Sequence, residues 1–406
     1  MTRSRLLLLG AVVFAAVYFV VDVRQRARLD RGIKRHRTDM TVYQAAAEAL
    51  VAGEDPYDAP NPRGYRYVYP PLLAILFMPI AGWAPENAAL VWFVVSAAAL
   101  GLSLVSLLRM RVGDDPPLGW APVLVAALVC LGFAHQGFQR GQVTHLLLGL
   151  QVGALAALLG RRFLLAGALL GIAGALRLTP LLPAAAVGLG LLVHGLRAKT
   201  SHAWLRFGAG LAASLAVGLV LIPWLALGTD EAQWVNARWL EVTRDLQSAD
   251  VDLASDYKIN EWRFKNQAPR RVVGTWTGWA QGADFVKERP QFEGGETPAG
   301  VDLAATVIAA LAVLLAVILG LRHLGDPGAR AFPLAYAIIL LLPVFVTRYA
   351  WPTHYLMALP ALALASAAAP WRVRGFGWGP AVVVFFSGAL LFYAAHARAL
   401  QWIGEA

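Results

Sequence analysis

The sequence predicts an all-α polytopic membrane protein with about 11 transmembrane helices. First, 58% of the 406 residues are hydrophobic and only 15% are charged, whereas soluble domains are about half apolar and a quarter charged. Second, apolar runs of roughly 18 residues recur along the whole chain, and each can cross a hydrocarbon core of about 30 Å. Since backbone polar groups in lipid must be paired within their own segment, the runs should be helices.

The first apolar run, Leu6 to Val23, is interpreted as an uncleaved helix. It is longer than the apolar region of a secretory signal, and no small-residue cleavage pattern closes it before Arg24. With this run as the first span at 6–23, the others are expected near residues 88–108, 119–134, 143–160, 163–176, 178–196, 207–227, 301–321, 331–346, 355–369 and 378–395.

The apolar stretch Pro71 to Ala84 is expected to be a re-entrant or interfacial helix on the outer face. Its 14 residues would span only about 21 Å as a helix, and it contains prolines. With this placement the later Lys- and Arg-rich connections share one face, which the positive-inside rule assigns to the cytoplasm. The chain is therefore expected to form one multi-pass domain, 1–406, in the cytoplasmic (inner) membrane. Its long loops, 24–87 and 228–300, then face the periplasm or exterior, although seven basic residues at 24–37 oppose the rule.

The best chemical candidate in the first outer loop is Asp39. Thr38 suits a helix N-cap and Gly53 a C-terminal stop, so 39–52 is expected to be a short helix at the membrane surface. Asp39 would lie in its first turn, where the helix dipole favours an ionised carboxylate, the form that a general base requires. An ordinary helix-stabilising acid would show the same pattern, so both interpretations stay open.

Further polar residues are expected at the outer ends of helices. Arg177 separates two apolar runs with no real loop between them. It either binds an anionic group such as phosphate or extends to the lipid headgroups. His354 is either a site residue or a structural interfacial histidine. The remaining members of this group are Arg140, Gln142, His145 and Arg348.

The second long loop is rich in tryptophan and in basic residues. Such side chains either contact sugar rings and phosphates or form an interfacial aromatic belt. They include Trp234, Trp239, Trp262, Trp276, Trp279, Arg238, Arg244, Lys258, Arg263, Lys265, Arg270 and Arg271. The net charge of +10 is assigned to membrane topology, so no nucleic-acid partner is expected. The single cysteine, Cys130, lies in an apolar run, and no metal or cofactor motif is present in the sequence.

Several of these motifs together resemble glycosyltransferase family 87. The resemblance begins with Asp39, Tyr43 and Ala46 and continues through Gly53-Glu54-Asp55-Pro56-Tyr57 and Tyr69-Pro70-Pro71-Leu72. It extends in order through Gly141-Gln142, Ala166-Gly167, Ala175-Leu176-Arg177-Leu178-Thr179-Pro180-Leu181, Asn266-Gln267 and Trp351-Pro352-Thr353-His354-Tyr355. The order covers most of the chain. Two departures are Arg177, where the family usually has lysine, and Ala268-Pro269 after Asn266-Gln267.

The resemblance implies a GT-C glycosyltransferase fold, with outer juxtamembrane helices and an active site built from the outer loops. It places the family's catalytic acid on Asp39. Expected substrate contacts are Arg177, Arg348, His354, Arg140, Gln142, Tyr43, Tyr57, Tyr69, Asn266 and Gln267.

The expected activity is transfer of a hexose, with mannose favoured, in an inverting reaction with Asp39 as base. The expected partners are membrane lipids, a polyprenyl-phosphate-linked sugar donor and a lipid-linked or polymeric glycan acceptor. The competing interpretations are a transporter or flippase of a polyprenyl-linked sugar and a non-catalytic scaffold.

Overall fold

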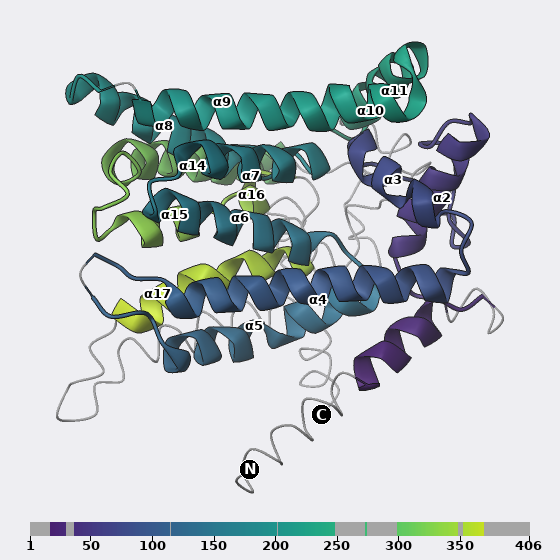
Figure 1. The fold of residues 1–406 in the computed structure, drawn as a ribbon, viewed down its shortest axis with the longest axis horizontal. Helices are drawn as coiled ribbons and strands as arrows, with labels where there is room; N and C mark the ends of the chain where they lie inside the picture. Colours follow the sequence, from purple (N-terminus) through teal and green to yellow (C-terminus); the bar gives the residue numbers. More distant parts are fainter. Residues whose placement is uncertain are drawn as a thin grey trace, which may run out of the picture. The chain divides into compact units, whose positions relative to one another are not determined.

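The computed structural model describes residues 17–29, 36–113, 115–200, 202–247, 273, 299–347 and 352–368. Within these ranges the chain forms helices and no strands, as Figure 1 shows. The expected span 378–395 lies outside them, as does most of the span expected at 6–23; residues 17–27 of the first helix are described.

The chain divides into two compact units. Unit 1 comprises Met1–Leu100, Ala134–Leu146 and Gly218–Ile259, and unit 2 comprises Gly101–Phe133, Leu147–Val217 and Asn260–Ala406. The helices α4, α5 and α6 each contribute residues to both units.

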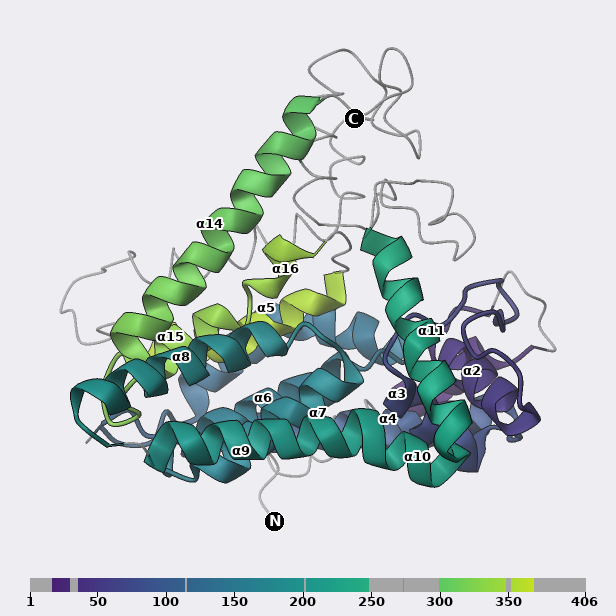
Figure 2. The ribbon, with the colours of Figure 1, turned by 90° about the horizontal axis from the view of Figure 1, so that it is seen from above.

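Unit 1 contains the short helices of the long connection 24–87 and the beginning of the connection 228–300. In the part of unit 1 that the structure describes, the elements are residues 17–27, α2 (Met40–Ala52), α3 (Pro71–Phe77), η1 (Met78–Ile80), part of α4 (Pro85–Arg109), the end of α5 (Trp120–Arg140), the start of α6 (Thr144–Leu159), the end of η2 (Val217–Leu221), α10 (Ile222–Leu227) and α11 (Thr229–Gln247). Helices α10 and α11 both contact α3, and Figure 2 shows α2, α3 and α11 close together.

The expected interfacial helix at 71–84 forms as the short pair α3 and η1. Pro71 occupies the start of α3, where its missing N–H costs no hydrogen bond. Pro79 then falls within η1. The ten residues together would extend only about 15 Å as a helix, so this segment is too short to cross a bilayer.

Unit 2 contains most of the remaining apolar helices. Its described elements are the rest of α4, α5 and α6, then α7 (Phe163–Leu176), α8 (Leu181–Arg197), α9 (His202–Ala216), α14 (Ala299–His323), α15 (Phe332–Ile339), α16 (Pro343–Val346), η3 (Pro352–Met357) and α17 (Ala358–Ala368). Helices α7 and α9 approach closely because both lack side chains where they cross. A Cβ atom at Gly167 would collide with the Phe207 carbonyl, and one at Gly210 with the Leu164 carbonyl.

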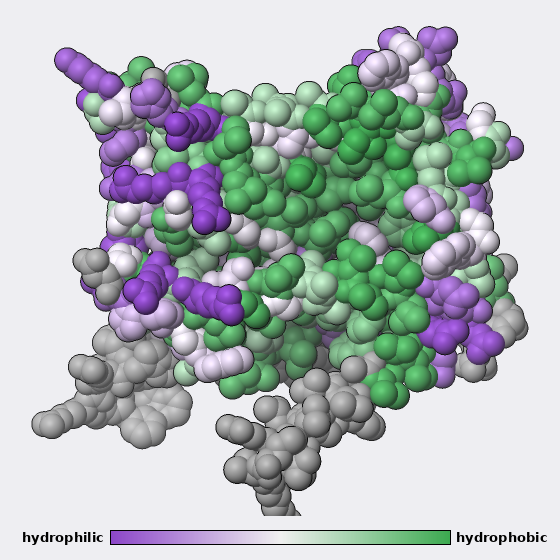
Figure 3. Space-filling view, viewed as in Figure 1, coloured by the Kyte–Doolittle hydropathy of each residue, from purple (hydrophilic) through white to green (hydrophobic). Residues whose placement is uncertain are grey.

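Four helices are long and apolar enough to cross a membrane, judged by length and composition: Pro85–Arg109, Trp120–Arg140, His202–Leu227 and Gly300–His323. Shorter apolar helices occupy most of the other expected spans, so the count of eleven is not confirmed. Hydrophilic residues gather where α9 begins at His202, and apolar residues cover much of its remaining length (Figure 3). One expected boundary was wrong: α5 continues to Arg140 rather than ending near 134, because helical hydrogen bonding persists after the apolar run stops.

Candidate functional site

Asp39 lies at the N-terminal end of α2, in unit 1. The expected capping arrangement was shifted by one residue: the helix begins at Met40, and Asp39 rather than Thr38 is the N-cap. The Thr38 hydroxyl still accepts a hydrogen bond from the Met40 N–H at 3.2 Å. Gly53 ends the helix as expected, with φ 72° and its N–H bonded to carbonyls of the last turn. The Asp39 carboxylate therefore stands at the positive end of a 13-residue helix.

A turn at the end of α5 holds the Asp39 segment. The helix closes with a Schellman arrangement, in which the Gly141 N–H donates to Phe138 O and the Gln142 N–H to Gly137 O. The Arg140 carbonyl, which has no partner within its own helix, accepts from the Asp39 N–H at 2.7 Å and from the Thr38 hydroxyl at 3.2 Å. Segments about a hundred positions apart in sequence are thereby fixed to each other at the Arg140 carbonyl.

Gly141 allows this contact in two ways. Its φ of 62° lies in the left-handed region, which disfavours any residue with a Cβ atom. A Cβ built on it would also stand 2.7 Å from Met40 Cβ and 3.1 Å from Thr38 Oγ1. The Gly141 carbonyl accepts from Trp92 Nε1 at 2.8 Å. At Gly141 the turn and the start of α2 therefore lie too close together for a side chain.

Within the described residues, the protein contacts the Asp39 carboxylate through one of its two oxygens, Oδ2. Gln142 Nε2 donates to Oδ2 at 2.9 Å, and Arg140 NH1 lies 3.9 Å from the same atom. In the described part of the chain, no side chain or backbone donor contacts Oδ1. The side chain is 26% exposed. One oxygen is thus oriented by the protein, and the other can accept a proton from a bound molecule.

A second carboxylate, Asp22, lies on the other side of the same turn. Arg26 Nε donates to both of its oxygens at 2.9 Å, and Gln139 Nε2 donates to Oδ2 at 3.0 Å. The carboxylate therefore uses both oxygens within the protein, and its side chain is 18% exposed. Asp22 lies in the helical segment 17–27 of the first helix.

His36, as a buried neutral imidazole, connects the helical segment that carries Asp22 to the start of α2, where Asp39 lies. The Ala27 carbonyl can only accept, so Nδ1 carries the proton of the 3.1 Å contact, and Nε2 accepts from the Thr41 hydroxyl at 2.8 Å. Asn61 Nδ2 donates to the same hydroxyl at 3.2 Å. Burial lowers the pKa of His36 below its ordinary value, although the Ala27 carbonyl acts in the opposite direction. The neutral ring ties the first helix to the start of α2.

Two of the tyrosines expected to contact substrate lie in a buried aromatic cluster. Tyr43 and Tyr57 are inaccessible to solvent, and Tyr69 is half-buried. Tyr43 packs edge-on against Tyr69 with 5.6 Å between ring centroids, and Tyr57 donates through its hydroxyl to the Tyr69 carbonyl at 3.2 Å. Burial also raises the pKa of neighbouring Tyr67 well above its ordinary value. Among these three expected contacts, Tyr69 is the one with an accessible surface.

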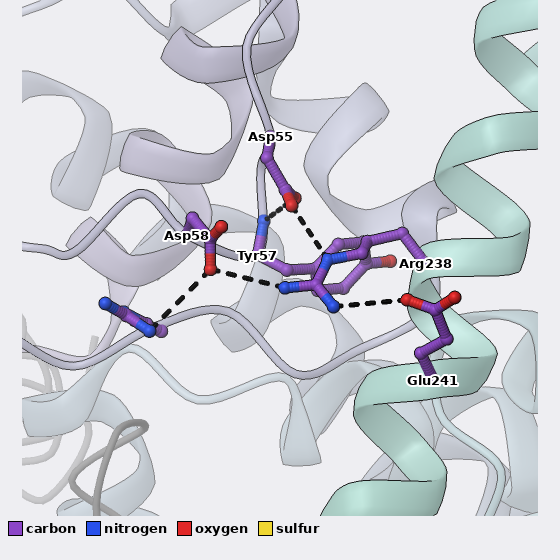
Figure 4. A network of polar contacts seen from close by, with 6 residues as sticks. Asp55, Tyr57, Asp58, Arg238 and Glu241 are labelled. Carbon is purple, nitrogen blue, oxygen red and sulfur yellow. Dashed lines mark hydrogen bonds and ion pairs between the residues drawn. The ribbon is translucent and has the colours of Figure 1, made fainter. Parts of the chain in front are cut away.

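Arg238 of α11 joins the long connection 228–300 to the long connection 24–87. Its guanidinium contacts Asp55 Oδ2 at 2.8 Å, Asp58 Oδ1 at 3.4 Å and Glu241 Oε2 at 3.2 Å (Figure 4). Asp55 also accepts from the Tyr57 N–H at 2.8 Å, a contact typical of a turn that begins with aspartate. The charge of Arg238 is therefore used within the protein. Trp239 is buried beside it, whereas Trp234 is exposed.

The other expected contacts belong to unit 2 or lie outside the described residues. Arg177 follows α7 directly and is half-buried. His354 is buried. Arg348, Asn266 and Gln267 lie outside the described residues, as do Trp262, Trp276 and Trp279.

Sequence reasoning missed several residues that shape this site. Asp22 and Gln139 carried a usable signal, because polar side chains at the ends of apolar runs need partners. Gly141 carried one as well, since glycine after a helical run is typical of a C-terminal cap. Nothing in the sequence indicated that Trp92 bonds the Gly141 carbonyl or that Arg238 meets Asp55. No group of three or more His, Cys, Asp or Glu that could hold a metal ion occurs among the described residues.

The chain was compared with family models, with curated proteins and with solved structures. The model of glycosyltransferase family 87 matches residues 67–343, which include Arg140, Gln142 and Arg177 but begin after Asp39. Among solved structures, the chain is similar to ArnT from Cupriavidus metallidurans in the apo state, with 17% identity and a TM-score of 0.40. That similarity covers 90% of this chain and 60% of the other, so the chain spans well under the full length of that protein. No curated protein matches the sequence.

Proposed function

The chain belongs to glycosyltransferase family 87, and we propose that it transfers a hexose from a polyprenyl-phosphate-sugar donor to a hydroxyl of a lipid-linked or polymeric glycan. Mannose is the sugar that the motif resemblance favours. The reaction would take place at the outer surface of the cytoplasmic membrane, where a polyprenyl chain can present its sugar phosphate. The family assignment and the apolar helices support a membrane glycosyltransferase; the donor, acceptor and mechanism are our proposal.

The observation that carries the proposal is the environment of Asp39. Its carboxylate stands at a helix N-terminus, Gln142 orients one oxygen, and the other oxygen meets no donor in the described part of the chain. A general base requires an ionised, oriented and reachable acceptor for the proton. Asp55, in the same loop, shows the opposite arrangement, because Arg238 and the Tyr57 N–H occupy its two oxygens.

The proposed step is a single inverting displacement. The acceptor hydroxyl attacks the anomeric carbon and gives its proton to Asp39 Oδ1, while the bond between the anomeric carbon and the phosphate oxygen breaks. The bonding electron pair leaves on that oxygen, so the phosphodiester becomes a phosphate monoester. Because the leaving group gains negative charge rather than needing a proton, nearby cations would stabilise the transition state.

Arg140 is the proposed phosphate contact nearest to Asp39. Its guanidinium lies 3.9 Å from the carboxylate, beyond hydrogen-bond distance, and is 30% exposed. It therefore retains donors for a phosphate group, which arginine binds through paired N–H groups. Arg177, Arg348 and His354 stay proposed phosphate contacts on the motif resemblance.

The remaining contacts are proposed for the sugar. Tyr69 offers a half-buried ring supported by Tyr43 and Tyr57, and aromatic faces suit the apolar faces of sugar rings. Gln142 is proposed to orient Asp39, while Asn266 and Gln267 stay expected contacts from the motif resemblance.

The test is a product assay with purified protein in lipid. Labelled polyprenyl-phosphate mannose, and the corresponding glucose and galactose donors, are incubated with a lipid extract and with reconstituted vesicles. A new glycosidic product that depends on Asp39 supports the proposal. Translocation of the donor without product would instead indicate a flippase, and neither activity would indicate a scaffold; both outcomes contradict it.

A further inference from the structure

Asp22 is an acidic residue in the first helix, outside the proposed catalytic machinery. Ionisable residues within membrane helices need a partner or a function, because burying an unpaired charge in lipid is costly. Here the partners are Arg26, four residues further along the same helix, and Gln139 of α5. The contact with Gln139 is the informative one, since it joins two segments 117 residues apart in sequence.

We propose that Asp22 is a positioning residue for the Asp39 site, acting through Gln139. The amide of Gln139 donates to Asp22 Oδ2 at 3.0 Å. The next three residues hold the site: the Arg140 carbonyl accepts from the Asp39 N–H, the Gly141 carbonyl accepts from Trp92, and the Gln142 amide donates to Asp39. Fixing Gln139 therefore fixes the start of the turn that orients the carboxylate.

Asp22 can hold Gln139 firmly because its carboxylate is itself fixed by further hydrogen bonds. Arg26 Nε donates to both oxygens, so the carboxylate accepts three hydrogen bonds from two side chains. Hydrogen bonds to a charged group are shorter and stronger than those between neutral groups. The pair with Arg26 also keeps Asp22 in place within its own helix. Gln139 is thus held by an acceptor that is itself immobilised.

The catalytic consequence of this anchor rests on the proposed function, whereas its structural part does not. If the turn shifts, the Asp39 N–H loses its carbonyl partner and the carboxylate loses its orientation. Displacements of about 1 Å in a reacting group can cost roughly a hundredfold in rate. Substrate binding elsewhere would be little changed, so the loss should appear in kcat rather than in KM.

The test compares Gln139→Leu with Gln139→Lys in the full-length protein in lipid. Gln139→Leu removes the donor to Asp22 but leaves the Asp22–Arg26 pair intact, whereas Gln139→Lys keeps a donor for the carboxylate. Hydrogen exchange at the Asp39 amide reports the turn directly, without reference to activity. We expect faster exchange and a kcat lowered about ten- to a hundredfold for Gln139→Leu, with both restored toward wild type in Gln139→Lys.

The inference is overturned if Gln139→Leu exchanges at the Asp39 amide as slowly as wild type, or if Gln139→Lys behaves as Gln139→Leu does. Should Gln139→Leu not fold, Gln139→Ala removes the same amide with less bulk and is read identically. If Asp39→Asn proves fully active, the proposed function fails while the exchange comparison still decides whether Asp22 positions the turn.

Discussion

Asp22 and Asp39 have the same kinds of partner, but these partners occupy their carboxylate oxygens differently. Each accepts from a glutamine amide of the turn 139–142, and each has an arginine nearby. Around Asp22 the arginine donates at 2.9 Å to both oxygens, whereas around Asp39 it stands 3.9 Å from one oxygen. Residue type alone therefore does not distinguish a structural carboxylate from a reactive one. The difference is whether the protein's own donors occupy both oxygens.

The largest expected effect separates the two carboxylates directly. Asp39→Asn should lower kcat about 10²- to 10⁴-fold, since a neutral amide cannot take the proton of the acceptor hydroxyl. Its thermal unfolding midpoint should change little, because the amide oxygen can still accept from Gln142. Asp22→Asn should instead lower stability by about 0.2–1 kcal/mol through the weakened, partly exposed pair with Arg26. Its loss of kcat should be far smaller, because the amide oxygen can still accept from Gln139. Rate measurements and thermal unfolding in detergent, run on both variants, check this.

Equal losses of kcat in the two variants would contradict the distinction between the carboxylates. A fully active Asp39→Asn would remove that residue from the proposed mechanism.

A smaller effect is expected when the turn itself is displaced. Gly141→Ala adds a Cβ atom 2.7 Å from Met40 Cβ at a position with φ 62°. The turn and the start of α2 must then separate, and kcat should fall about ten- to a hundredfold. Gly113→Ala is the matched control, because it has the same φ of 62° but no atom within 4 Å of the added Cβ. If kcat falls equally in the two variants, backbone strain and not the contact with Met40 causes the loss.

His36 should make the connection between the first helix and the start of α2 sensitive to pH. Its pKa in the folded protein is lowered by burial, so the unfolded chain binds a proton at a pH where the folded one does not. Stability contributed by the neutral ring is therefore fully present above the ordinary value of 6.5 and is lost as pH falls from there toward the folded pKa. The unfolding midpoint of wild type should drop over this window more than that of His36→Gln. Parallel curves for the two proteins would refute this assignment.

The smallest effect is expected from the Arg238 network. Arg238→Gln removes a tight ion pair with Asp55, but the side chain is 25% exposed. Partly exposed pairs contribute about 0.2–1 kcal/mol, so the unfolding midpoint should fall slightly while kcat stays near the wild-type value. A large loss of kcat would mean that the contact of Arg238 with Asp55 participates in the reaction, so that the rate would not depend on Asp39 alone.

Much of the helical framework could be predicted from apolar runs. The helices at 88–108, 143–160, 163–176 and 301–321 occur close to their expected places, because 18 or so apolar residues have few alternatives to a helix in lipid. Boundaries were less predictable. Helix α5 continues through Gln139 to Arg140, since a helix end depends on capping contacts as well as on hydropathy.

The candidate site was predictable in part. The motif order indicated family 87, which the family comparison confirms, and it singled out Asp39 and Gln142, which the structure places in contact at 2.9 Å. The catalytic role of Asp39 stays a prediction. The expected Thr38 cap was wrong by one residue: the helix begins at Met40 with Asp39 as its N-cap, while the Thr38 hydroxyl accepts from the Met40 N–H.

The sequence by itself determined that this chain is a helical membrane protein, since its apolar runs must bury themselves in lipid, and that its polar residues gather in a few connections. Only the tertiary structure decided which of their charged groups are already bound by other groups of the protein. Asp22, Asp55 and Asp39 are equally acidic in the sequence, yet Arg26 and Arg238 bind the first two closely, while Arg140 stays away from the third. The physical reason is that hydrogen-bond strength changes over distances of about 1 Å, which are set by packing between segments far apart in the chain.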